Sequence, residues 1–133
     1  MGRIVSRDVL FKLVFELCFH QSDIDNYYDH MLDDDDNADI DKDWITNIYT
    51  DIIDKTDELK NAVSKYLKGY TIERVFKVDL AILMLALYEL KYTNTDSKIV
   101  ANEAVELAKK YSTEKSSKFI NGVIASAIND IRK

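Results

Sequence analysis

The stretch that decides the fold is Asp79-Leu-Ala-Ile-Leu-Met-Leu-Ala-Leu-Tyr-Glu-Leu90, which is apolar at nearly every position. Its leucines and alanines are strong helix formers, and it contains neither glycine nor proline. A helix that is apolar on all sides is buried inside a protein or a membrane. The run is shorter than the roughly 18 residues that a membrane span requires. It therefore predicts the central helix of a water-soluble bundle.

The rest of the chain also favours helices. It has 133 residues, no proline and only three glycines, so the usual breakers of helices are scarce. The sequence predicts one all-α domain over residues 1–133, with about six to seven helices and no linker. The apolar periods and polar turns place seven helices at residues 6–20, 24–32, 44–53, 56–67, 79–90, 99–111 and 116–131, and residues 71–77 are a further candidate for a short helix.

The first of these helices has an unusually wide apolar face. Ser6 is the expected N-cap, because its hydroxyl can accept hydrogen bonds from the first turn. Beyond the stripe that one core requires, Phe11, Phe15 and Cys18 widen the apolar side. The exposed part of such a face predicts contact with a partner, or with a second copy of the chain in a homodimer.

Charge is distributed unevenly along the chain. The net charge of −6 argues against general nucleic-acid binding. Residues 21–59, however, hold fourteen acidic and two basic residues, whereas residues 98–133 hold four acidic and seven basic ones. We expect an acidic side and a mildly basic surface where the two ends of the chain fold together.

The sequence contains no complete motif for catalysis or metal binding. The acidic run 33–43 has oxygen ligands at alternate positions, but Ala38 replaces the glycine and Trp44 the glutamate of a calcium loop. Cys18 and His20 lack the second half of a zinc site, and no base can be assigned to a nucleophile. We expect no enzyme activity, no cofactor and no metal. A single cysteine favours a reducing cytoplasm.

Cations and aromatic residues alternate in the last third of the chain, at Lys109, Lys110, Tyr111, Lys115, Lys118 and Phe119. Proteins bind single-stranded RNA with this combination, because cations attract phosphates and aromatic rings stack on bases. The alternative is that both rings belong to the core and that the lysines only cover them. Composition alone favours this second interpretation.

Three segments of the chain, taken in order, resemble a known family. Asn102-Glu-Ala-Val-Glu-Leu-Ala-Lys-Lys-Tyr111, followed by Lys118-Phe-Ile-Asn-Gly-Val123, is similar to the C-terminal signature of the NusB family of transcription antitermination factors. Residues 79–90 resemble its central helix, and residues 6–15 resemble its first helix more loosely. The resemblance implies an all-α fold of two packed helical subdomains. It also implies binding of boxA-type single-stranded leader RNA together with NusE, a small-subunit ribosomal protein, within the antitermination complex of RNA polymerase.

The resemblance also implies roles for individual residues. RNA-binding positions of the family correspond to Arg3, Arg7, Tyr111, Lys118 and Phe119. Positions that face the protein partner correspond to Phe15 and Asp79.

Some residues depart from the family pattern. Ile4, Val5 and Ser6 interrupt the N-terminal arginine cluster, and Leu80 and Met84 stand where arginine is frequent. With fewer cations, fewer counterions are released on binding, so we expect RNA binding to be weak without the partner. The alternative is a protein-only interaction module of the same fold that has lost RNA binding.

Overall fold

The computed structural model describes residues 3–19, 40–69 and 71–132, without the side chain of Arg3. These residues form no strand, which confirms the all-α prediction. The helices are α1 (Arg3–Leu17), α3 (Lys42–Asp54), α4 (Thr56–Lys65), the short 3-10 helix η2 (Ile72–Arg74), α5 (Lys77–Tyr92), α6 (Ser97–Tyr111) and α7 (Glu114–Ile131). The predicted helix at 24–32 and the acidic residues 33–39 lie outside the described residues.

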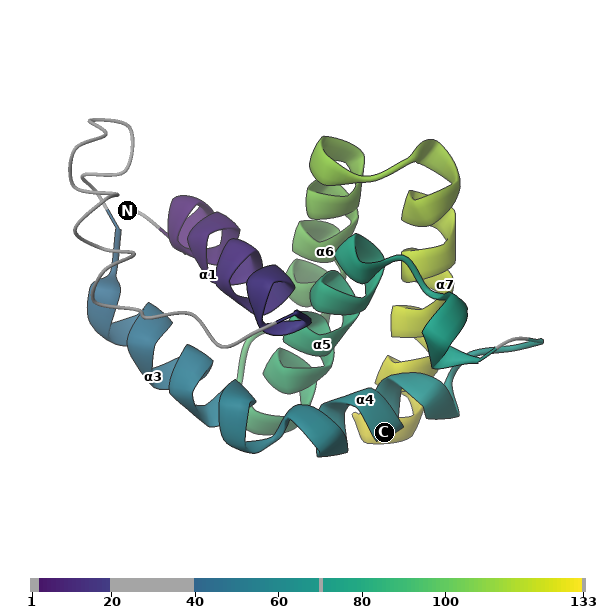
Figure 1. Ribbon diagram of the computed structural model, residues 1–133, viewed down its shortest axis with the longest axis horizontal. Coiled ribbons are helices and arrows are strands. Elements are labelled where there is room, and N and C mark those ends of the chain that lie inside the picture. The colour runs from purple at the N-terminus through teal and green to yellow at the C-terminus, as the bar shows by residue number, and fades with distance from the viewer. Residues whose placement is uncertain (1–2, 20–39, 70, 133) are drawn as a thin grey trace.

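Helix α5 is the centre of the molecule, as its sequence predicts. Every residue from Asp79 to Leu90 is buried. Helices α1 and α4 pack on α5, and so do α6 and α7, which also pack on each other, while α3 packs on α1 (Figure 1). The chain thus forms two helical subdomains that share α5 as their common core, and this geometry confirms the predicted architecture.

Side-chain caps fix the starts of three helices. Asp41 accepts a hydrogen bond from the N–H of Trp44 at α3, Asp96 from that of Lys98 at α6, and Thr113 from that of Ser116 at α7. These short polar side chains satisfy N–H groups that have no partner inside the helix.

The predicted cap at Ser6 is wrong. Helix α1 begins at Arg3, so Ser6 lies within it, fully buried. Its hydroxyl instead accepts a hydrogen bond from the N–H of Asp41, at 2.8 Å. Ser6 therefore joins the beginning of α3 to α1 rather than starting a helix.

Arg132 ties the end of α7 to the end of α5. Its guanidinium donates to the backbone carbonyls of Glu89 (3.1 Å), Leu90 (3.1 Å) and Thr93 (2.8 Å), and to the carbonyl of Thr95. The last carbonyls of a helix have no partner inside it and carry partial negative charge, so a cation is favoured there. One arginine thus holds three segments of the C-terminal subdomain together.

None of the described helices is both long and apolar enough to cross a membrane.

Candidate nucleic-acid interface

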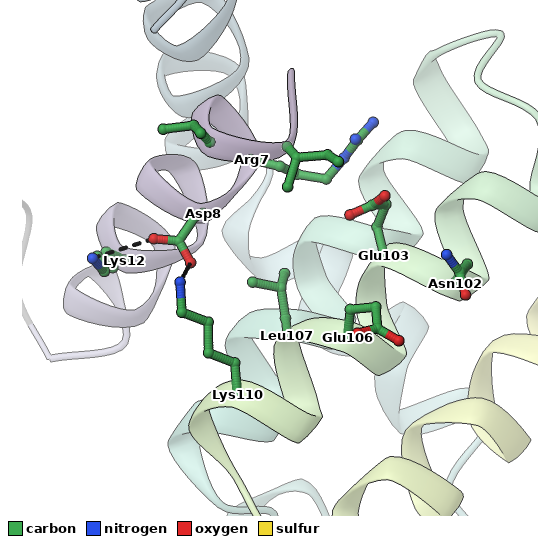
Figure 2. Close-up of a pocket in the computed structure, with 10 residues that line it drawn as sticks. Arg7, Asp8, Lys12, Asn102, Glu103, Glu106, Leu107 and Lys110 are labelled. Carbon is green, nitrogen blue, oxygen red and sulfur yellow. Dashed lines mark hydrogen bonds and ion pairs between the residues drawn. The ribbon is translucent and has the colours of Figure 1, made fainter. Parts of the chain in front are cut away.

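A pocket of about 700 Å³ opens between α1 and α6 (Figure 2). From α1, Ile4 and Val5 line it with exposed apolar side chains, and from α6 come Glu103 and Glu106. Its lining mixes both signs of charge with apolar atoms. It is therefore not the continuous basic surface that the charge distribution predicts.

Asp8 joins α1 to α6 at the edge of this pocket. Its carboxylate accepts hydrogen bonds from Tyr111 (2.7 Å) and Lys110 (3.1 Å) and pairs with Lys12 (3.2 Å). Figure 2 shows the carboxylate between the two lysine amino groups. Burial raises the pKa of Asp8, but the hydrogen bonds from Tyr111 and Lys110 and the charge of Lys12 outweigh it, so the pKa lies below its ordinary 3.8. Both lysines are therefore already partly neutralised.

Tyr111 and Phe15 belong to one continuous run of aromatic rings. The ring of Tyr111 stacks on buried Phe11 with centroids 5.0 Å apart, and Phe11 stacks on Phe15 at 6.3 Å. Phe15 meets the edge of Phe19 at 5.4 Å, and Phe19 is 62% exposed. The run therefore connects a residue predicted to bind RNA with one predicted to bind protein.

Arg7 is buried, contrary to the role that the resemblance implies. It is 5% exposed, and its guanidinium donates to both carboxylate oxygens of Glu89 on α5, at 2.7 and 3.0 Å. The guanidinium also lies over the ring of Trp44, 5.6 Å from its centroid. A phosphate would have to displace a buried carboxylate to reach Arg7, so in this fold the side chain joins α1, α3 and α5.

Lys118 and Phe119 lie on different sides of α7. Lys118 is exposed and lines a shallow groove of about 500 Å³ between α6 and α7. Phe119 is half-buried and lines a second groove, of about 600 Å³, between α7 and the segment that leads into α5. Adjacent helical residues point about 100° apart, so this separation follows from the helix itself.

Asp79 forms the floor of the groove that contains Phe119. The residue is 4% exposed, and its carboxylate accepts hydrogen bonds from the hydroxyls of Ser112 (2.7 Å) and Ser116 (2.8 Å). These serines belong to the turn between α6 and α7 and to the first turn of α7. Asp79 therefore holds the start of α7 against the start of α5, and little of it is left exposed to a partner.

The structure thus distributes the predicted site residues over several surfaces. Tyr111 and Phe15 share the aromatic run, whereas Lys118 and Phe119 lie on two sides of α7. The side chain of Arg3 lies outside the described residues.

Glu89 and Phe11 have roles in the structure that the sequence does not reveal. Glu89 is an acid inside an otherwise apolar helix, and a buried charge requires a partner of opposite charge. That rule could have predicted an ion pair, although not which cation provides it. The sequence places Phe11 on a wide apolar face, but its contact with Tyr111 depends on how α1 and α6 pack.

No three histidine, cysteine, aspartate or glutamate side chains within the described ranges are placed to hold a metal ion.

Comparison with known proteins places this geometry in a family. The model of the NusB family matches residues 4–129. The transcription antitermination protein NusB of Acetivibrio thermocellus is 36% identical over 129 residues, which cover 96% of this chain and 89% of the relative. The protein of the same name from Staphylococcus aureus strain JH9 is 38% identical over 126 residues, covering 95% and 98%.

A solved structure shows the same architecture. The structure of T. maritima NusB superposes with a TM-score of 0.83 and 27% identity, over 100% of this chain and 94% of the solved one. The family match spans nearly the whole chain, and the fold agrees with it from α1 to α7. This chain belongs to the NusB family of transcription antitermination proteins.

Proposed function

We propose that this chain is a non-catalytic adaptor that binds boxA-type single-stranded leader RNA together with NusE. In that complex it would promote read-through by RNA polymerase, above all on rRNA operons. Membership of an antitermination family supports the role in transcription. The observation that carries the RNA-binding part is the exposed cation and half-exposed ring of Lys118 and Phe119 on α7.

Lys118 and Phe119 have the clearest roles in this proposal. Lys118 is exposed and can bind a phosphate by releasing a counterion. Phe119 presents part of its ring to a groove in which a base can stack. Tyr111, which lies at the end of α6 and stacks on Phe11, remains a proposed RNA contact, and Arg3 remains a proposed phosphate contact. Arg7 is removed from the direct contacts, because it is buried against Glu89.

The proposed protein contact lies at the end of α1. Phe19 is 62% exposed, and its ring packs against that of Phe15. Exposed aromatic rings are typical anchors of protein interfaces. Asp79 would act on this complex indirectly, by holding Ser112 in the turn after α6 and Ser116 in the first turn of α7.

The test is RNA binding by the full chain, with and without NusE, at two salt concentrations. We expect weak binding by the chain alone and a marked gain when NusE is added. Phe119→Ala should lower the affinity for RNA about five- to 150-fold, since a stacked base contributes about 1–3 kcal/mol. Circular dichroism of the variant controls for folding, because loss of helix would mean that Phe119 acts only in the core.

The second candidate is a protein-only interaction module. It is favoured by the ion pairs that the cations near α1 form within the protein. Arg7 is paired with Glu89, while Lys12 and Lys110 share Asp8. Capture of the chain on immobilised NusE separates the two candidates. Equal capture with and without boxA-type RNA would favour the protein-only module, and stronger capture with RNA would favour the adaptor.

A further inference from the structure

The groove beside Phe119 has a second aromatic wall, at Phe76. Phe76 directly precedes α5 and is 65% exposed. Within the described ranges no other ring stacks on it. A ring this exposed leaves most of its apolar surface in water, which is unfavourable unless a ligand covers it.

The backbone at Phe76 is held firmly in place. Phe76 occupies the N-cap of α5, and its carbonyl accepts the first hydrogen bond of the helix from Leu80, at 2.8 Å. Before it, Val75 is extended and 5% exposed, so it anchors the segment in the core. The orientation of the chain at Phe76 is therefore fixed on both sides, although the ring itself is outside.

Phenylalanine is also a poor choice for the cap position. The described chain caps α3, α6 and α7 with Asp or Thr side chains, whereas Phe76 makes no side-chain cap bond. A polar side chain at this position would stabilise the helix by accepting a hydrogen bond from its first turn. A residue that violates a local rule and also exposes apolar surface is more often found at a functional site.

Exposed side chains of both charges surround the groove. Arg74 and Lys115 line it together with Glu114, all of them exposed, and the exposed Glu73 and Lys77 flank residues 74–76 in the chain. The carboxylate of Asp79, which lines the groove, is buried and accepts hydrogen bonds from two serine hydroxyls. Exposed cations around aromatic walls suit a ligand with a flat apolar face and a negatively charged backbone, which is single-stranded nucleic acid.

We propose that Phe76 is a base-stacking residue and that one nucleotide of the bound RNA enters the groove between the starts of α5 and α7. Its base stacks on Phe76 in the groove that Phe119 also lines. Its phosphate lies toward Arg74 and Lys115. The groove volume of about 600 Å³ is in the usual range for small-ligand sites, roughly 300–1,000 Å³. The inference rests on the proposed RNA-binding function and adds a contact to it.

The experiment uses the full chain, saturating NusE and boxA-type RNA that carries the fluorescent base 2-aminopurine at one position at a time. In the unmodified protein, we expect one position to be quenched by stacking when the RNA binds. Phe76→Leu keeps an apolar side chain without the ring, and it should abolish that quenching and weaken binding about five- to 150-fold. Phe76→Tyr keeps the ring and should retain both the quenching and the affinity.

Tyr92→Leu is the matched control. Tyr92 is 42% exposed and lies at the opposite end of α5, so losing its ring should leave RNA binding unchanged. Because Phe76 is exposed, its variants should keep their helical content in circular dichroism.

Two results would overturn the inference while leaving the proposed function standing. In the first, Phe76→Leu keeps the RNA affinity and the quenching of the unmodified chain, whereas Phe119→Ala binds RNA weakly. The other is weaker NusE binding by Phe76→Leu in the absence of RNA, because the groove would then belong to the protein partner. If the unmodified chain with NusE binds no RNA at all, the proposed function itself fails and the inference fails with it.

Discussion

Two regions of this molecule hold their cations in opposite ways. Beneath α1, Arg7 is 5% exposed and bound at two points by Glu89. Along the start of α7, Lys115 and Lys118 are exposed and form no ion pair within the described part of the chain. The same charge therefore stabilises the fold in one region and remains available to a ligand in the other.

This difference decides which cations can contribute to RNA binding. A buried guanidinium has already lost its water and its counterion, so a phosphate would gain little from meeting it. Removing it from Glu89 would also leave a buried carboxylate without a partner. An exposed lysine keeps its counterion until a phosphate replaces it. Counting basic residues in the first helix therefore overstates the charge available to RNA.

The largest expected effect comes from breaking the buried pair. Arg7→Met leaves Glu89 buried and unpaired, and removing one partner of such a pair costs about 3–5 kcal/mol. We expect the free energy of unfolding in urea to fall by that amount. The double variant Arg7→Met with Glu89→Met removes both charges and should recover most of the loss.

The opposite pattern would reverse the comparison. If Arg7→Met kept the stability of the unmodified chain but bound RNA less tightly, the side chain would act at the RNA surface. If the double variant were no more stable than the single one, the contact between Arg7 and Glu89 would not explain the loss.

Residues 79–90 show why much of the fold could be predicted from the sequence. An apolar run of this length with good helix formers has only one suitable place in a small all-α protein, the centre of the bundle. The polar turns were equally clear, since Asp96 and Thr113 cap helices in the structure where the sequence shows polar residues. These features are local, so sequence alone can identify them.

The sites were harder to predict, because they depend on which helices meet. Arg7 and Glu89 are 82 positions apart, and Tyr111 and Asp8 are 103 positions apart. No periodic pattern encodes such pairs. Nothing in the sequence distinguishes Phe76, because an aromatic residue beside an apolar helix is usually buried. Only its 65% exposure in the folded chain marks it as unusual.

A smaller effect is expected at Asp8, which lies between the two regions. Its pKa is lower in the folded protein than its ordinary 3.8, so it stabilises the fold above that pH. This contribution is lost as the pH falls through the lowered pKa. Asp8→Asn should therefore be less stable than the unmodified chain at neutral pH, and the difference should shrink in acid. Urea unfolding of both proteins across this range measures it.

Tyr111→Phe is the matched control for Asp8. It keeps the ring on Phe11 but removes the hydroxyl that donates to Asp8 at 2.7 Å. The difference between the unmodified chain and this variant should shrink in acid in the same direction. A difference that stays constant with pH would show that the carboxylate of Asp8 gains nothing from its partners in the folded state.

The smallest expected effect is at Lys118, and it concerns binding rather than folding. Each phosphate contact with single-stranded nucleic acid contributes about 0.7 to the slope of log K against log salt. Lys118→Gln should reduce the slope by about that amount and leave urea unfolding unchanged.

Lys65→Gln is the control, because Lys65 pairs with Asp130 at the far end of α7 and should not affect the slope. An unchanged slope in Lys118→Gln would mean that even an exposed cation on α7 is not used by RNA. Exposure would then be necessary for a phosphate contact but insufficient to identify one.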